Sequence, residues 1–173
     1  MSSTTSKVGK SSDNQAKPKS SGSLLVVNLR GLVNTRVPVR TTLEQLKVAR
    51  RFNATFVPHD SVHIGMLGLA KEHVAWCPLN ADTAEKILKT RSEKSTGNRV
   101  SESEISNEHG SFHDIASALE SGNIKLSSIE QIRPFFRLSP PRGGFKRSIR
   151  RQYRDGGILG PNDELSNLVE RML

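Results

Sequence analysis

The apolar positions in the first half of the chain alternate between short, mostly apolar runs and helical spacings. The runs at Leu24–Leu29, Ala54–Val57 and Val74–Cys77 have the length and composition of buried strands. Two intervening segments repeat apolar side chains every three or four residues, as amphipathic helices do. Residues 23–78 are therefore predicted to form strand, helix, strand, helix, strand. This alternation favours an α+β fold with both helices on one face of a small sheet, whose other face is covered by the C-terminal part or by another molecule.

Local signals predict where these two helices begin. Thr41 and Glu44 have the spacing of a capping box, so the first helix is expected to start there and to run to Phe52. Asp60 or Ser61 can cap the second helix.

The rest of the chain is predicted to be helical, with polar loops. Helices are expected at residues 80–89, 112–119 and 127–132, and a last one begins near residues 161–163 after a turn-rich linker at 156–163. The resulting organisation is a flexible basic arm (1–22), an α+β core (23–78), a helical segment with an acidic module at 100–132 (79–132) and a basic extension with a C-terminal helix (133–173).

The charge and hydropathy of the chain limit the kinds of partner that it can bind. The formal net charge is +9 and only 34% of the residues are hydrophobic, which points to an anionic partner rather than a large self-sufficient core. No stretch is long and apolar enough to span a bilayer. The expected anionic partner is therefore nucleic acid rather than a membrane. The single cysteine, Cys77, is consistent with a reducing cytoplasm.

The strongest signal for binding is the stretch from Arg133 to Arg154, which carries eight basic residues and no acid. Phe135, Phe136, Phe145 and Tyr153 lie among these charges, and a Pro-Pro and a Gly-Gly pair interrupt them. Arginine favours bidentate phosphate contacts and stacking on bases. The contact residues predicted in this stretch are Arg137, Arg142, Gly143, Gly144, Phe145, Lys146, Arg147, Arg150, Arg151 and Arg154. Basic residues in predicted loops, namely Arg30, Arg36, Arg40, Lys94 and Arg99, are further candidates.

The residues that could support catalysis do not form a recognisable motif. His59, His63 and Cys77 could ligate a metal, but structural zinc sites use tighter Cys/His spacings. Cys77 ends an apolar strand beside Trp76, where a packed thiol is expected rather than a nucleophile. We therefore predict no enzymatic activity, no cofactor and no small-molecule substrate.

Several short motifs, in this order, resemble the large-subunit ribosomal protein family numbered thirty in the universal scheme, in its long archaeal form, to which the eukaryotic large-subunit protein number seven also belongs. The motifs are Asn28-Leu29-Arg30-Gly31, Gly65-Met66-Leu67, Phe135–Leu138, Pro141-Arg142-Gly143-Gly144-Phe145-Lys146 and Asp155-Gly156-Gly157.

This resemblance implies a core related to the ferredoxin-like fold, with a three-stranded antiparallel sheet, two helices and a helical, basic C-terminal extension. It also implies a structural role in the large ribosomal subunit in the cytoplasm. Carried over by position, it implies rRNA contacts in the core at Arg30, Gly31, Arg36, Arg50 and Arg51. The partners would be large-subunit rRNA, neighbouring ribosomal proteins and, as a candidate, the 5S rRNA. The alternatives are a ribosome assembly factor, a DNA-binding regulator and a metal enzyme built on His59, His63 and Cys77.

Overall fold

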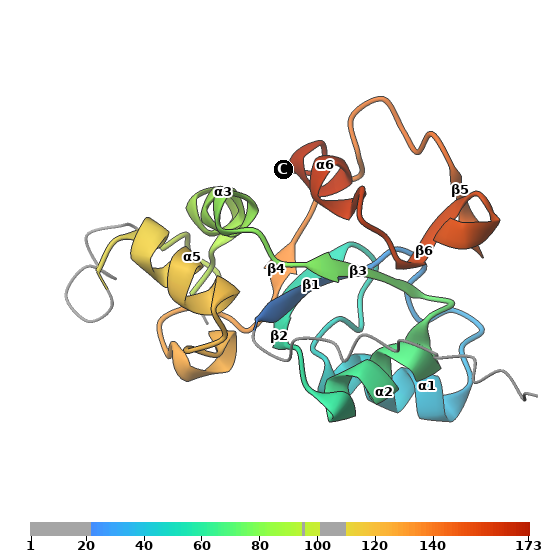
Figure 1. The fold of residues 1–173 in the computed structure, drawn as a ribbon, viewed down its shortest axis with the longest axis horizontal. Helices are drawn as coiled ribbons and strands as arrows, with labels where there is room; N and C mark the ends of the chain where they lie inside the picture. Colours follow the sequence, from blue (N-terminus) through green and yellow to red (C-terminus); the bar gives the residue numbers. More distant parts are fainter. Residues whose placement is uncertain (1–21, 95, 101–109) are drawn as a thin grey trace, which may run out of the picture.

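The computed structural model describes residues 22–94, 96–100 and 110–173. These residues form a six-stranded sheet with helices on both faces, in the strand order β4-β2-β1-β3-β6-β5 (Figure 1). The strands are β1 Ser23–Asn28, β2 Asn53–Pro58, β3 Val74–Pro78, β4 Phe136–Arg137, β5 Ser148–Gln152 and β6 Gly157–Pro161. The helices are α1 Val37–Gln45, α2 Ser61–Ala70, α3 Ala81–Arg91, α5 Phe112–Glu120 and α6 Leu165–Glu170.

β1 organises the core, because all of its residues are buried and it pairs antiparallel with both β2 and β3. Side chains alternate along a strand, so each face of β1 packs on a different group of helices. Leu24 and Val26 pack with α1 and α2, whereas Leu25 and Val27 pack with α3, α5 and α6. The second face of the sheet is thus covered by the C-terminal half of the chain, as the first of the two alternatives predicted, and not by another molecule.

The α+β class and the strand–helix–strand–helix–strand order of residues 23–78 are confirmed. The core strands β1, β2 and β3 pair antiparallel as expected, but the sheet has six strands rather than three, because the C-terminal extension adds β4, β5 and β6. That extension is therefore mixed strand and helix, not simply helical. Residues 156–163 are also not a turn-rich linker, since they contain β6, which pairs in parallel with β3. Glycine and proline give this segment the local pattern of turns, and its strand conformation comes from the partner strand.

α1 begins before the expected capping box. Its N-cap is Arg36, and Pro38 lies in the first turn, where its fixed φ suits a helix start. Thr41 lies inside α1 and its hydroxyl donates to the Val37 carbonyl at 3.1 Å. The predicted cap at Thr41 is wrong, and Glu44 instead accepts a hydrogen bond from Arg40 at 3.0 Å.

α1 also ends before Phe52. The Lys47 amide donates to the Glu44 carbonyl and the Val48 amide donates to the Leu43 carbonyl, at 3.0 and 2.9 Å. Lys47 has φ +61°, so these bonds form a Schellman motif that ends the helix. Val48, directly after the motif, is fully buried beside α1 and α2.

Of the other predicted helices, three form where expected and two do not. α2 begins after Asp60, and α3 and α5 match their expected spans within two residues. The helix expected at 127–132 is wrong, since only a 3-10 turn at Leu126–Ser128 forms there. The last helix begins at Leu165, after the expected start. The expected basic arm at 1–22 and part of the acidic module fall on residues 1–21 and 101–109, outside the described residues.

Candidate nucleic-acid interface

The loop after β1 is held by the buried side chain of Asn28. Its Oδ1 accepts hydrogen bonds from the amides of Arg30 and Gly31, at 3.1 and 2.8 Å. Gly31 has φ +79°, and a Cβ at this position would lie 3.4 Å from the Cβ of Arg51. The exposed Arg30 guanidinium donates to the Glu72 carbonyl at 3.2 Å. Arg30 is therefore presented at the surface on a fixed backbone, beside Arg51.

Arg51 and Phe52 connect this loop to the C-terminal extension. Arg51 Nε donates to the Leu29 carbonyl at 3.0 Å, and its guanidinium carbon lies 4.6 Å from the centroid of the Phe52 ring. On the extension, the ring of Phe145 stacks with Phe52 at a centroid distance of 6.2 Å and an interplanar angle of 25°. The two rings thus bring the segment that carries Arg51 into contact with the basic loop of the extension.

The basic loop itself is fixed from the end of α6. Arg171 donates to the carbonyls of Arg142 and Gly144, and the Arg142 amide donates back to the Arg171 carbonyl at 2.9 Å. Gly143 and Gly144 have φ of +74° and +71°, the left-handed region that glycine adopts most readily. The Gly-Gly pair therefore forms a left-handed turn, and Arg171 holds it in one conformation.

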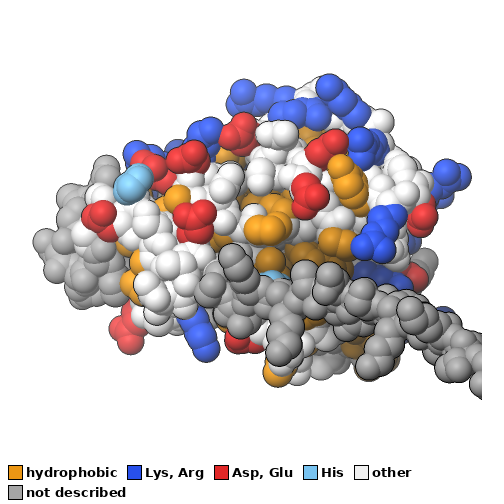
Figure 2. Space-filling view, viewed as in Figure 1, with side chains coloured by type: hydrophobic (Ala, Val, Ile, Leu, Met, Phe, Trp, Pro, Cys, Tyr) orange, Lys and Arg blue, Asp and Glu red, His pale blue; other side chains and the backbone are white. Residues whose placement is uncertain are grey.

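β5 carries the remaining cations along the free edge of the sheet. Its Arg150 and Arg151 are exposed, as is Arg154 in the turn that follows. Arg147 lies 5.0 Å from the Tyr153 ring centroid and 3.2 Å from a carboxylate oxygen of Glu164. Lys and Arg gather along the upper edge and the right-hand end of the molecule in Figure 2, where Figure 1 places the basic loop and β5.

The structure brings most, but not all, of the predicted contact residues together. Those of the basic loop and β5 lie together, and the ring pair joins the basic loop to Arg51 and Arg30. Arg137 lies on β4, at the opposite edge of the sheet from β5, where it shares a pocket with Arg50. Arg40 is partly neutralised by its ion pair with Glu44. Lys94 and Arg99 lie apart from this surface, in the loop after α3 at the α5 end of the molecule (Figure 1).

Three residues that shape this surface were missed from the sequence. Asn28 orients the Arg30 loop, Arg171 fixes the basic loop, and Lys47 lies beside Arg50 and Arg137 in a surface pocket. Only the positive charge of Arg171 and Lys47 could have suggested them, because their contacts are with residues distant in the sequence.

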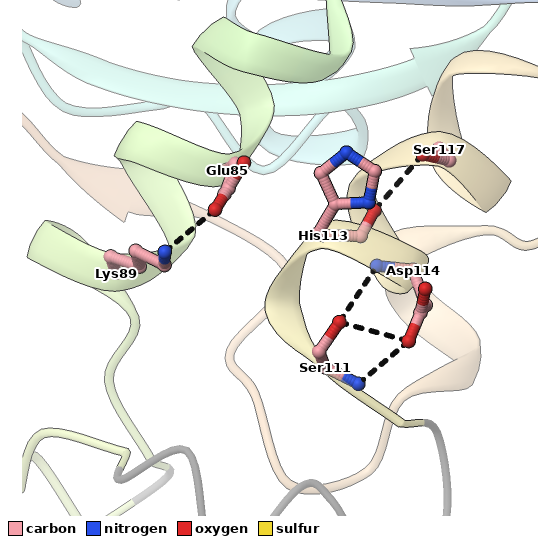
Figure 3. Close-up of polar contacts among 6 residues, drawn as sticks. All are labelled: Glu85, Lys89, Ser111, His113, Asp114 and Ser117. Atoms are coloured by element: carbon pink, nitrogen blue, oxygen red, sulfur yellow. Dashed lines mark hydrogen bonds and ion pairs between the residues drawn. The ribbon is translucent and has the colours of Figure 1, made fainter.

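The surface of α3 and α5 has a different character (Figure 3). The Ser111 hydroxyl and amide donate to the Asp114 carboxylate at 2.8 and 3.0 Å, which lowers the pKa of Asp114. Together with the Asp114 amide bond to the Ser111 hydroxyl, they form a capping box at the start of α5. On α3, Lys89 forms an ion pair with Glu85 at 2.6 Å and lowers the pKa of that carboxyl. This face alternates acids and bases and presents no continuous positive surface.

Of the residues considered for catalysis or metal binding, Cys77 is packed in the core. Cys77 is buried in β3, and this burial raises the pKa of its thiol above the ordinary value. A raised pKa disfavours the nucleophilic thiolate. Among the described residues, His, Cys, Asp and Glu form no group of three suited to a metal ion. The helices of the described part are also too short or too polar to cross a membrane.

The sequence of this chain is similar to those of known proteins. No family model matches the chain. The large ribosomal subunit protein uL30 of Nitrosopumilus maritimus is 34% identical over 151 residues, which make up 87% of this chain and 97% of that protein. The uL30 protein of Ignicoccus hospitalis is 37% identical over 153 residues, covering 86% of this chain and 96% of its own. The chain belongs to the uL30 family.

The uL30 protein of Korarchaeum cryptofilum is similarly related, at 35% identity over 153 residues. The resemblance inferred from Asn28–Gly31 and Pro141–Lys146 is thereby confirmed. Because each uL30 relative is matched over more than nine-tenths of its length, the similarity includes the extension as well as the core.

Proposed function

We propose that this uL30-family chain is a structural constituent of the large ribosomal subunit, where it binds large-subunit rRNA near the 5S rRNA. The observation that carries the proposal is the surface that joins Arg30 and Arg51 to the basic loop and β5 through the stacked rings of Phe52 and Phe145. Its cations are exposed, and its backbone is held by side-chain hydrogen bonds. A preorganised positive surface loses little conformational freedom when it binds a polyanion.

The chemistry of the surface favours recognition of phosphates and shape over readout of paired bases. Arginine forms bidentate contacts with phosphate, and the release of condensed counterions adds to the affinity. The major groove of A-form RNA is too deep and narrow for side chains, so phosphate, 2′-OH and stacking contacts dominate. The proposed contact residues are Arg30, Gly31, Arg36, Arg50, Arg51, Arg137, Arg142, Gly143, Gly144, Phe145, Lys146, Arg147, Arg150, Arg151 and Arg154.

The mixed surface of α3 and α5 is proposed to face neighbouring ribosomal proteins rather than rRNA. A DNA-binding regulator would present a recognition helix with basic side chains for the major groove. Here the proposed contacts lie mainly on loops and on an edge strand, which favours folded RNA as the ligand.

The test replaces Arg142, Lys146, Arg150 and Arg151 together by Glu in the full chain. These side chains are exposed, so the variant should stay folded while it loses binding to deproteinised large-subunit rRNA and co-sedimentation with large subunits in high salt. A control with the same charge change replaces four exposed lysines outside the surface, namely Lys71, Lys86, Lys89 and Lys125. Wild-type binding by the first variant, or equal loss by both, would refute the proposed interface.

A further inference from the structure

We infer that a pocket at the β4 edge of the sheet holds one unstacked base of the rRNA, with Phe135 as its stacking surface and Asn53 as its hydrogen-bonding group. The inference rests on the proposed function and assigns a specific ligand to one place on the surface. The pocket has a volume of about 320 Å³, which falls within the range of small-ligand sites. It is lined by Glu44, Lys47, Ala49, Arg50, Asn53, Phe135 and Arg137.

Strand pairing brings the polar and aromatic groups of the pocket together. In β4, Phe136 is fully buried in the core, where its ring lies 5.0 Å from that of Phe56. Because side chains alternate, Phe135 and Arg137 point to the opposite face, towards the turn after α1. Asn53 of β2 lies directly opposite Arg137 in the register. The pocket is therefore built from two paired strands and the turn that joins α1 to β2.

Asn53 supplies the pocket with a side-chain amide that can act as both donor and acceptor. Its side-chain amide forms no hydrogen bond with any part of the chain that the structure describes, and its polar atoms are not among the fully buried ones, so they are open to the pocket. The amide is therefore free to donate to and accept from a ligand in the pocket. A nucleobase edge offers both an acceptor and a donor to a side-chain amide.

Phe135 provides the apolar surface that a base needs. The ring is half-buried, and among the described residues it has no aromatic neighbour. The guanidinium carbon of Arg137 lies 6.0 Å from its centroid, at the limit of a cation–π contact. Stacking of an unpaired base on an aromatic side chain is a general means of binding single-stranded RNA.

The rim of the pocket supplies charge for the phosphates on either side of such a base. Lys47, Arg50 and Arg137 are exposed there. Glu44 is the one carboxylate in the lining, and it is paired with Arg40 at 3.0 Å, so its charge is offset. An apolar floor with a cationic rim distinguishes this pocket from a site for a free anion, which would need donors at its base.

The test compares two substitutions of Phe135 in the full chain, using deproteinised large-subunit rRNA as the probe. Phe135→Leu keeps apolar volume but removes the π-face, and we expect it to weaken rRNA binding by about ten-fold without changing the salt dependence. Phe135→Trp keeps a π-face and should bind like the wild type. Val62→Ala, which truncates an exposed apolar side chain on α2, is the control and should bind normally.

A second readout locates the base directly. Ultraviolet crosslinking of the wild-type complex should attach a nucleotide to the peptide that contains Phe135, and Phe135→Leu should remove that crosslink. If Phe135→Leu binds rRNA as tightly as the wild type, the base pocket is refuted while the proposed function stands. If the wild-type chain does not bind large-subunit rRNA at all, the proposed function fails, and the pocket fails with it.

Discussion

The side chain of Asn28 donates a hydrogen bond from Nδ2 to the main-chain carbonyl of Val48, at 2.7 Å and across twenty residues of sequence. The oxygen of the same amide accepts from the amides of Arg30 and Gly31. One fully buried side chain thus connects the loop that presents Arg30 with the turn that leads to Arg50 and Arg51.

Replacing Asn28 by Ala should lower the free energy of unfolding by roughly 2–3 kcal/mol, because the Val48 carbonyl and the Gly31 amide would stay buried without partners. Urea denaturation measures this loss. Asn167→Ala, which truncates an exposed asparagine on α6, should unfold like the wild type. A wild-type midpoint for Asn28→Ala would show that water replaces these bonds.

Replacing Lys47 by Gly should stabilise the fold and weaken rRNA binding. Its φ of +61° is unfavourable for a residue with a Cβ, so Lys47→Gly should raise the free energy of unfolding by about 1 kcal/mol. The same change removes a cation from the rim of the pocket, and rRNA affinity and the slope of its salt dependence should both fall. Lys47→Ala is the matched control, which should lose the same affinity without gaining stability. Unchanged affinity in both variants would exclude Lys47 from the interface.

Gly157 should tolerate no side chain. A Cβ at this position would lie 1.9 Å from the carbonyl oxygen of Arg151, so β5 and β6 could not keep their contact. We expect Gly157→Ala to displace β5, to lower the free energy of unfolding by about 2 kcal/mol or more, and to weaken rRNA binding.

Gly65→Ala is the comparison for this variant, because a Cβ there meets nothing within 4 Å in the middle of α2. Alanine is the better helix former, so Gly65→Ala should stabilise the protein by about 0.5–1 kcal/mol. Thermal unfolding and hydrogen exchange of β5 would measure both variants. Normal protection of β5 in Gly157→Ala would mean that the strands can shift to accept the methyl group.

The capping box of α5 should make stability depend on pH. Hydrogen bonds from Ser111 lower the pKa of Asp114 below its unfolded value, which is about 3.9. The carboxylate therefore stabilises the fold above that pH, and this contribution is lost as the pH falls through the lower, folded-state pKa. Asp114→Asn should be less stable than the wild type near neutrality, and the difference should shrink in acid.

Urea titrations at several pH values between about 2 and 7 would test this dependence on Asp114. Glu120→Gln, at the other end of α5, controls for the loss of one carboxylate and should keep the wild-type pH slope. Identical pH slopes for the wild type and Asp114→Asn would show that the capping bonds contribute no stability.

Elements with strong local signals were predicted well. Asp60 and Asn80 occupy the N-cap positions of α2 and α3, and the run LLVVN is the central strand. α1 was misplaced because two local signals compete, and the helix follows Pro38 rather than Thr41. Its end was missed because the stop at Lys47 uses a conformation that lysine rarely adopts, held in place by the burial of Val48.

In the candidate interface, too, local features could be predicted from the sequence and contacts between distant residues could not. The cations and the Gly-Gly pair of the basic stretch are visible in the sequence, because charge and backbone freedom belong to single residues. The contact of Arg171 with Arg142 and the pairing of Asn53 with Arg137 each join segments far apart in the chain. No local pattern predicts contacts of this kind.

The sequence by itself determined the α+β class, the central strand and the positions of the charges, since all three follow from local propensity and composition. The tertiary structure alone decided that β6 is a strand, that Phe52 meets Phe145, and that Asn53 lines a pocket with Phe135. The physical reason is that strand pairing, ring stacking and burial are energies between distant residues, whose partners are chosen only when the whole chain folds.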